Sequence, residues 1–264
     1  MKTPITLYGG KGQLLSVIHP LVPEHLTYNE PFIGGGALFW SKEPSAVEVI
    51  NDVNCELINF YEMVQNEFIE LEKYIRKSLH SRSIYNDALI IYSNPHLFNK
   101  VQRAWAVWVL ASQSFAYKLG SGWGYEKRVK KITGVIANKR NSFTFDYALR
   151  LEKVQIECTD ALKVIRSRDN PQAFHYCDPP YFNASCGHYK GYTIYEFEEL
   201  LKTLELIEGK FLLSSYSSEL LTCYTKRNGW YNKMIDFPLA VCSGVGAKGK
   251  RKMEILTANY PLTD

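Results

Sequence analysis

Short apolar runs fall into two blocks along this chain, and a long segment of helical pattern separates them. Between about residue 55 and residue 145, apolar side chains recur at the three- and four-residue spacing of a helix face. A sheet whose strands lie on both sides of such a segment must carry it as an insertion. We therefore predict an α/β domain formed by residues 1–60 and 146–264, with a mostly helical insertion at residues 61–145. The runs that predict strands are residues 27–32, 47–51, 154–158, 173–177, 210–216, 230–237 and 253–260.

Helices can be placed within this layout. Three runs have apolar side chains near helical spacing, at residues 54–65, 68–79 and 101–115. Thr193 and Glu196 have the spacing of a capping box, in which each side chain bonds the other's backbone N–H, so a helix should begin there. The side chains expected to face the core from this helix are Phe197, Leu200, Leu201, Leu204 and Ile207.

A stiff polar segment, Asp178-Pro179-Pro180-Tyr181, directly follows the strand-like run at residues 173–177. Open α/β sheets bind ligands at this end of a strand. Each proline fixes its own φ, and the second also favours extended geometry in the first. The Asp-Pro-Pro-Tyr segment can therefore present a carboxylate, a prolyl carbonyl and an aromatic face to a flat, amino-bearing substrate such as a nucleobase. A rigid turn without a ligand is the structural alternative.

A second motif, Glu30-Pro31-Phe32-Ile33-Gly34-Gly35-Gly36, runs from a strand through a glycine turn into an apolar helix start. Such a turn lets the backbone approach a ligand closely. A dinucleotide fingerprint would need a small residue three positions after Gly36, where this chain has Phe39. Asp52 follows the strand-like run at residues 47–51, where an acidic side chain can accept both hydroxyls of a ribose. A ribose without a pyrophosphate indicates S-adenosylmethionine.

Four motifs occur in a characteristic order: Tyr8-Gly9-Gly10-Lys11, the glycine motif that begins at Glu30, Asn51-Asp52, and the Asp-Pro-Pro-Tyr segment. In these motifs, and over nearly its whole length, the chain resembles the Dam-type (class alpha) DNA adenine-N6 methyltransferases. The resemblance implies a Rossmann-like, seven-stranded S-adenosylmethionine-dependent methyltransferase sheet with a mostly helical target-recognition insertion. It also implies that the substrate is double-stranded DNA.

The resemblance implies a set of site residues as well. Those expected to bind S-adenosylmethionine are Tyr8, Lys11, Glu30, Phe32, Gly34, Gly36, Asp52, Asp160 and Asp178. Those expected to carry the reaction are Asp178, Pro179, Pro180 and Tyr181. The expected reaction is site-specific transfer of a methyl group to N6 of an adenine that has been flipped out of the duplex, because enzymes cannot reach the atom inside the stack. No metal is expected.

Two basic, glycine-containing segments are expected to contact DNA phosphates, and aromatic rings among the charges could stack or wedge. A solvated charged face is the structural alternative. The side chains assigned to DNA binding are Lys118, Trp123, Tyr125, Lys127, Arg128, Lys130, Lys131, Lys139 and Arg140 in the first segment, and Lys248, Lys250 and Arg251 in the second.

Two departures from the family pattern limit how far the family's site residues can be assigned to this chain. Leu7 stands where Dam has a tryptophan, and Tyr8 lies beside it, so the aromatic contact to the cofactor is expected to be shifted. Residues 115–125 differ from the Asn-Gly/Arg-Tyr-Asn type hairpin that reads the target in Dam-like relatives. A GATC target is therefore not assumed.

Other functions remain open at this point. A planar amino group is also present in RNA adenine and in a glutamine side chain, although the basic insertion favours a polynucleotide. A catalytically silent DNA-binding protein should have lost the Asp-Pro-Pro-Tyr segment or the glycine turn, and both are intact. A dinucleotide-dependent oxidoreductase is disfavoured by Phe39.

Composition indicates which kind of partner and which cellular compartment to expect. The net charge of +4 is only mildly basic, so a polyanion should be met by a local surface. Six cysteines show no metal-site spacing and are expected to be reduced, mostly buried thiols. The N-terminus does not look like a signal peptide, and no stretch approaches 18 uninterrupted apolar residues, so a cytoplasmic, soluble monomer is expected. Whether a cognate restriction endonuclease accompanies it depends on genomic setting.

Overall fold

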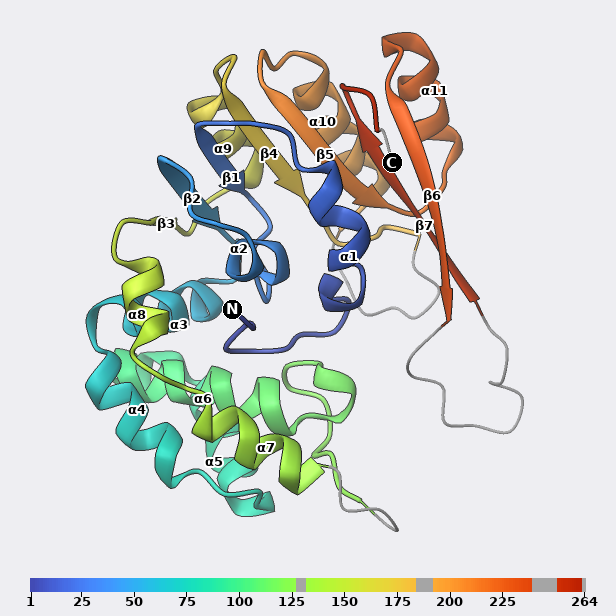
Figure 1. Cartoon of the computed structure of the whole chain (residues 1–264). Helices are drawn as coiled ribbons and strands as arrows, with labels where there is room; N and C mark the ends of the chain where they lie inside the picture. Colours follow the sequence, from blue (N-terminus) through green and yellow to red (C-terminus); the bar gives the residue numbers. More distant parts are fainter. Residues whose placement is uncertain (127–131, 184–191, 239–250, 263–264) are drawn as a thin grey trace. The chain divides into compact units, whose positions relative to one another are not determined.

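The computed structural model describes residues 1–126, 132–183, 192–238 and 251–262 (Figure 1). Contacts divide the chain into two compact units. The helical unit consists of Met1–Ser16, Ile33–Pro44 and Asn51–Cys158. The sheet unit consists of Val17–Phe32, Ser45–Ile50 and Thr159–Asp264.

The strands are β1 (Thr27–Glu30), β2 (Val47–Asn51), β3 (Gln155–Glu157), β4 (Ala173–Cys177), β5 (Lys210–Ser215), β6 (Tyr231–Pro238) and β7 (Arg251–Ala258). They form one seven-stranded sheet in the order β3-β2-β1-β4-β5-β7-β6. β2, β1, β4 and β5 pair in parallel, whereas β7 pairs antiparallel with both β5 and β6. Each run that predicted a strand overlaps one of these strands, so the Rossmann-like sheet is confirmed.

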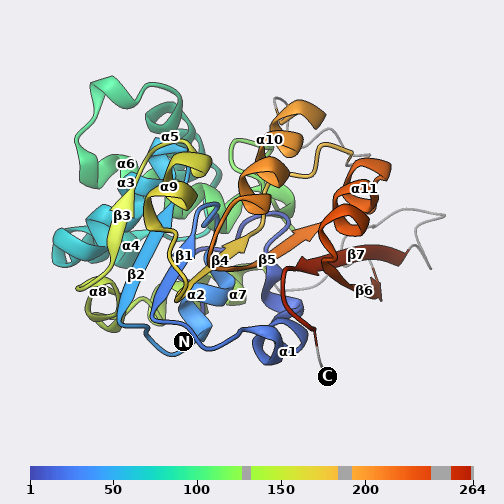
Figure 2. The same ribbon diagram turned by 90° about the horizontal axis from the view of Figure 1, so that it is seen from above.

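The helices of the sheet unit include α9 (Ala161–Arg168), α10 (Ile194–Glu205) and α11 (Glu219–Asn228). All three cover the same face of the sheet (Figure 2). A short helix α1 (Leu15–Ile18) and a 3-10 turn η2 (His19–Leu21) precede β1. Buried side chains from these helices and the sheet form one core cluster, which includes Ile165, Phe197, Leu200, Leu204, Phe211, Leu213, Leu221 and Ile255.

The predicted capping box at the start of α10 is present. The backbone N–H of Thr193 donates to Glu196 at 2.6 Å, and the backbone N–H of Glu196 donates to the Thr193 hydroxyl at 3.3 Å. Four of the five apolar side chains expected to face inward do so within the helix, and Ile207 packs against the same core just beyond the helix end. Local chemistry thus fixes both the start and the buried face of α10.

The helical unit is built mainly from α3 (Cys55–Asn66), α4 (Phe68–Lys77), α5 (Arg82–Ser93), α6 (Lys100–Gln113), α7 (Ile132–Asn141) and α8 (Asp146–Leu151), with α2 (Ala37–Ser41) after the glycine turn. Short 3-10 turns are η1 (Lys11–Gln13), η3 (Pro95–Leu97) and η4 (Phe115–Tyr117). The three helices predicted in the insertion correspond to α3, α4 and α6 and end within two residues of the expected positions. α6 is the central helix, because it contacts α3, α4 and α5 and buries Trp108 completely. None of the described helices is long and apolar enough to cross a membrane.

Candidate functional site

The carboxyl ends of β1 and β4 lie side by side in the sheet unit. The two strands pair in parallel, with Asn29 opposite His175. β2 lies on the far side of β1 and β5 on the far side of β4, so the strand order reverses between β1 and β4. Ligands of open α/β sheets bind at such a switch point. The structure therefore brings Glu30, Phe32 and the segment beginning at Asp178 to one edge of the sheet.

Glu30 is a buried carboxyl at this edge, with 2% of its surface exposed. The hydroxyl of Tyr28 donates a hydrogen bond of 2.5 Å to Glu30 Oε2. Burial, and then the charge of Glu30, raises the pKa of Tyr28 well above its usual value, so the phenol keeps its proton and remains a donor. The orientation of Glu30 is thus fixed by the protein itself.

Tyr181, the last residue of the Asp-Pro-Pro-Tyr segment, is held by a series of polar contacts. Its hydroxyl lies 2.7 Å from Ser214 Oγ on β5 and 3.4 Å from Asp178 Oδ1. Ser214 Oγ lies 3.5 Å from Glu254 Oε2 on β7, and both side chains are buried. The ring of Tyr181 is therefore anchored through its hydroxyl, while Asp178 remains partly exposed.

Three residues of this region were not identified from the sequence: Ser214, Glu254 and Tyr216. The ring of Tyr216 meets that of Tyr181 edge-on, with centroids 4.5 Å apart. The available signal was weak, because a hydroxyl at a strand end and a single carboxylate in an apolar run also occur in ordinary edge strands. Their role becomes visible only once β5 and β7 are paired.

The glycine turn of residues 33–36 lies in the helical unit and needs left-handed backbone at Gly34 (φ 47°) and Gly36 (φ 65°). A Cβ at Gly36 would lie 2.9 Å from Ile33 Cδ1 and 3.0 Å from the Trp40 ring, so any other residue there would have to displace these side chains. The N–H of Gly34 donates to Asp52 Oδ2 at 3.1 Å, and the Tyr61 hydroxyl donates to the Gly34 carbonyl at 2.6 Å. The structure thus brings the predicted Gly34, Gly36 and Asp52 together.

Asp52 has both oxygens engaged, because its Oδ1 accepts the N–H of Asn54 at 2.9 Å. Burial raises the pKa of Asp52, and the N–H donors of Asn54 and Gly34 oppose this rise. Each carboxylate oxygen has a second lone pair, so a ribose hydroxyl could still be accepted.

The N-terminal motif, Tyr8-Gly9-Gly10-Lys11, forms a tight turn in the helical unit. Gly9 has a φ of 80°, and the N–H of Gly10 donates to the Leu7 carbonyl at 3.1 Å. Lys11 is buried, with 5% exposed, and its Nζ donates to the Gly9 carbonyl at 3.1 Å. The segment before the motif lies against the glycine turn, since a Cβ on Gly35 would be 3.3 Å from the Ile5 carbonyl.

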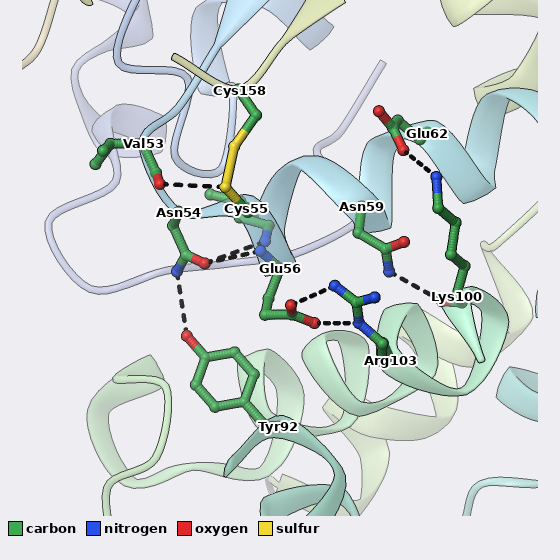
Figure 3. A network of polar contacts seen from close by, with 11 residues as sticks. Val53, Asn54, Cys55, Glu56, Asn59, Glu62, Tyr92, Lys100, Arg103 and Cys158 are labelled. Carbon is green, nitrogen blue, oxygen red and sulfur yellow. Dashed lines mark hydrogen bonds and ion pairs between the residues drawn. A yellow bond between two sulfur atoms is a disulfide. The ribbon is translucent and has the colours of Figure 1, made fainter. Parts of the chain in front are cut away.

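The start of α3 anchors the loop that carries Asp52 (Figure 3). Asn54 Oδ1 accepts the N–H groups of Glu56 and Leu57 at 3.1 and 3.3 Å, which caps the helix. Asn54 Nδ2 donates to the Tyr92 hydroxyl on α5 at 3.1 Å. Glu56 accepts two bonds, of 2.5 and 2.9 Å, from Arg103 on α6. These contacts bind the Asp52 loop to two helices of the insertion.

The cysteine prediction was wrong for one pair. Cys55, at the start of α3, forms a disulfide with Cys158 after β3, with Cα atoms 5.7 Å apart (Figure 3). The 103 residues between them hide the pairing in the sequence. Cys177 is a buried free thiol as expected, whereas Cys223 is free but exposed. The cysteines outside the described residues are Cys186 and Cys242.

Asp160, one of the predicted cofactor residues, is the N-cap of α9. Its Oδ1 accepts the N–H of Lys163 at 3.1 Å, and its side chain is exposed. This position has a structural role that requires no ligand.

The insertion contains a hairpin at residues 113–124, in which Ser114 bridges Trp123. The Trp123 ring stacks on His80 at 4.7 Å and on Tyr125 at 5.8 Å, and its Nε1 donates to Gln113 at 3.2 Å. The predicted Trp123 is thus packed into the unit, whereas Tyr125 is 53% exposed.

The predicted DNA-binding cations differ in their surroundings. Lys118 and Arg140 are partly exposed. Lys139 faces the Tyr117 ring at 5.0 Å, and burial lowers its pKa to about 8. The remaining predictions fall on residues or side chains outside the described part of the chain, namely Lys127, Arg128, Lys130, Lys131, Lys248, Lys250 and Arg251. In the described residues, no group of three or more His, Cys, Asp or Glu side chains could hold a metal ion.

Sequence comparison identifies known proteins that are similar to this chain. A family model described as D12 class N6 adenine-specific DNA methyltransferase matches residues 8–234. The chain is 51% identical over 67 residues to a type II methyltransferase, M1.LlaDCHI, of Lactococcus lactis subsp. cremoris, covering 24% of this chain and 23% of that relative. It is 27% identical over 223 residues to the DNA N-6-adenine-methyltransferase of Escherichia phage P1, covering 75% of this chain and 27% of that one. It is 24% identical over 270 residues to the DNA adenine methylase of Escherichia coli strain K12, covering 96% and 92% of the two chains. The matched part spans about a quarter of the length of the first two relatives.

Proposed function

Because the chain belongs to the D12 class of N6 adenine-specific DNA methyltransferases, we propose that it transfers a methyl group from S-adenosylmethionine to N6 of a flipped-out adenine in double-stranded DNA. The observation that carries this proposal is the Asp-Pro-Pro-Tyr segment at the β1/β4 switch point, with Tyr181 anchored to Ser214 at 2.7 Å. This arrangement places a partly exposed carboxylate beside a fixed aromatic ring.

The residues present fit an adenosyl donor. A Cβ at Gly34 would meet nothing within 4 Å, so the space beside the glycine turn is open there, and Asp52 places a carboxylate within hydrogen-bond distance of the same turn. We assign binding of S-adenosylmethionine to this turn, Asp52 and Lys11. By resemblance we add Tyr8, Glu30, Phe32 and Asp160. When bound, the cofactor supplies a methyl group on a positively charged sulfur.

Asp178 and Pro179 would hold the amino group of the adenine. The N6 amine is a poor nucleophile, because its lone pair is conjugated with the ring. Hydrogen bonds from its two N–H groups to the Asp178 carboxylate and the Pro179 carbonyl would increase electron density at N6 and aim the lone pair. After transfer, N6 carries an extra proton, which Asp178 can accept and pass to water. Tyr181 would stack on the base and offset part of the cost of flipping, which is a few kcal/mol.

We assign DNA contact to the helical insertion, residues 61–145. Its exposed rings and partly exposed cations, among them Tyr125, Lys118 and Arg140, combine stacking surface with phosphate-directed charge. We propose a cytoplasmic enzyme that acts as a monomer; a cognate restriction endonuclease would be an additional partner.

The proposal is tested by incubating the protein with methyl-labelled S-adenosylmethionine and either mixed-sequence duplex DNA or RNA. We expect label only in DNA, as N6-methyladenine within a short shared sequence context. Label confined to RNA, or no transfer from a preparation that melts cooperatively, would overturn it. Mapping the modified adenines also identifies the target sequence.

A further inference from the structure

Two consecutive residues other than glycine adopt left-handed backbone in the hairpin of the helical unit. Ala116 has a φ of 55° and Tyr117 a φ of 58°. A side chain with a Cβ is sterically disfavoured in this region, and two such residues in succession are uncommon. Conformations of this kind persist only where surrounding contacts hold them, and they concentrate at functional sites. The contacts around the Ala116–Tyr117 turn therefore indicate its role.

Local hydrogen bonds hold the turn within the hairpin. The N–H of Tyr117 donates to the Ser114 carbonyl at 3.2 Å, and the N–H of Lys118 donates to the Phe115 carbonyl at 3.3 Å. The Ser121 hydroxyl lies 2.9 Å from the carbonyl of Phe115 and 2.8 Å from that of Lys118. Phe115 itself is 60% exposed, so the turn presents an apolar side chain to solvent.

A buried cation supports the turn from α7. Lys139 Nζ lies 5.0 Å from the centroid of the Tyr117 ring and has no hydrogen-bond partner among the described residues. Burying an ammonium group costs hydration energy, and the contact with the face of the aromatic ring is the main interaction that offsets this cost here. The contact therefore fixes the Tyr117 ring against α7 and with it the direction of the residue's backbone.

The same residue contacts the N-terminal motif. The carbonyl of Tyr117 accepts the backbone N–H of Tyr8 at 3.1 Å, across more than a hundred residues of sequence. Tyr8 begins the turn in which Lys11 Nζ donates to the Gly9 carbonyl at 3.1 Å. Because φ and ψ set where a carbonyl points, a change in the Ala116–Tyr117 turn would withdraw this acceptor from the motif.

We propose that the Ala116–Tyr117 turn couples DNA contact by the hairpin to cofactor binding by the N-terminal motif. This inference rests on the proposed function, which supplies both ligands. Tyr117 is a positioning residue in this scheme, and its carbonyl holds the motif in the conformation that binds the cofactor. DNA that fixes the exposed side of the turn then tightens cofactor binding, and by linkage the cofactor tightens DNA binding by the same factor.

The test uses the whole protein and S-adenosylhomocysteine, the unreactive product, in titrations with and without a saturating DNA duplex that contains a methylated target site. Ala116→Val disfavours the left-handed turn, because a β-branched side chain is strongly strained there. Ala116→Gly is the matched control, because glycine adopts that conformation freely. We expect Ala116→Val to weaken binding of S-adenosylhomocysteine by roughly 3- to 10-fold, the worth of one backbone hydrogen bond, and to lose its tightening by DNA. Ala116→Gly should stay within about twofold of the wild type.

Equal affinity and equal DNA response in the wild type and Ala116→Val would overturn the coupling. If Ala116→Val does not melt cooperatively, the inference is tested instead by hydrogen exchange of the wild type. DNA should slow exchange at the Tyr8 amide several-fold, and an unchanged rate would overturn the inference. A wild type that binds the product and methylates DNA without any coupling leaves the proposed function standing. A wild type that does neither removes the proposed function itself.

Discussion

At the scale of residues, the two carboxylates that the proposal uses differ in their exposure and in their hydrogen bonds. Asp178 is partly exposed and lies at 3.4 Å from the Tyr181 hydroxyl. Asp52 is buried enough to raise its pKa and is oriented by two backbone N–H groups. The first side chain lies beside the Tyr181 hydroxyl, and the second is part of the turn that it stabilises.

Replacing Asp178 with Ala should remove activity without unfolding the protein. The variant loses the acceptor that aims the N6 lone pair, so we expect kcat to fall by at least about a hundredfold. Asp87→Ala, on the exposed surface of α5, is the control and should keep normal turnover. Both variants are compared in a labelled-methyl assay and by thermal unfolding. Near-normal turnover of Asp178→Ala would exclude this side chain from the mechanism.

Protonation of Asp52 is expected to make cofactor binding and the stability of the fold depend on pH in opposite directions. Its raised pKa means that it takes up a proton at a higher pH than an ordinary aspartate. As pH falls through this pKa, the ionised acceptor for ribose is lost, so binding of S-adenosylhomocysteine should weaken. The same group stabilises the fold when protonated, and this contribution is lost as pH rises through its folded pKa. Titrations from about pH 4 to 8 should show the trend in the wild type and not in Asp52→Asn. An unchanged pH profile in that variant would assign the effect to another group.

Asp178 and Tyr181 could be predicted as site residues from the sequence, because a strand end followed by two prolines is a local signal. The sequence does not identify Ser214 or Glu254, because their importance depends on the pairing of β5 with β7. Lys139 was assigned to phosphate contact from its place in a basic run, and its contact with the Tyr117 ring could not be predicted because the two residues lie in different elements.

At the scale of elements, the glycine turn and α2 show how backbone geometry limits sequence. Gly34 and Gly36 both have positive φ, but their surroundings differ. A Cβ at Gly34 would meet nothing within 4 Å, whereas one at Gly36 would lie 2.9 Å from Ile33 Cδ1 and 3.0 Å from the Trp40 ring. A substitution at Gly34 therefore measures backbone strain alone, whereas a substitution at Gly36 measures backbone strain together with steric crowding.

Gly34→Ala should lower the free energy of unfolding by about 1–2 kcal/mol, the cost of left-handed backbone for a residue with a Cβ. Gly36→Ala should cost more, because Ile33 and Trp40 must also move. Urea unfolding of the two variants measures the difference, and binding of S-adenosylhomocysteine shows whether the turn still accepts the ligand. Equal losses of stability would show that the crowding at Gly36 is relieved without cost.

The boundaries of α3, α4 and α6 could be predicted from apolar spacing, and the start of α10 from its capping box. The hairpin could not, because its shape depends on two left-handed residues, Ala116 and Tyr117, whose side chains do not favour that conformation. Contacts from Tyr8 and α7, which are distant in sequence, add to the local hydrogen bonds that hold the turn.

At the scale of the whole molecule, the seven strands of the α/β sheet could be predicted from the apolar runs, and their assembly into one Rossmann-like sheet was implied by the family resemblance. The disulfide does not follow from the sequence, because Cys55 and Cys158 are 103 residues apart. It closes a long loop, which in the chain-entropy description restricts the unfolded state.

Reduction of this disulfide should lower the stability of the protein. Reductant, or Cys55→Ser, is expected to decrease the free energy of unfolding by about 2–4 kcal/mol. Cys223→Ser removes an exposed free thiol and serves as the control. Thermal melts with and without reductant should shift for the wild type and for Cys223→Ser, but not for Cys55→Ser. Identical melts of the wild type under both conditions would show that the bond carries no stability.

The closed base of that loop has a consequence for how such an enzyme could be re-engineered or could diverge. The Cα atoms of Cys55 and Cys158 are 5.7 Å apart, so the two ends of the intervening segment lie close together. A segment from a relative with similarly spaced ends could be joined at these two cysteines, provided that it keeps the contacts that Tyr61 and Tyr117 make with the glycine turn and the N-terminal motif.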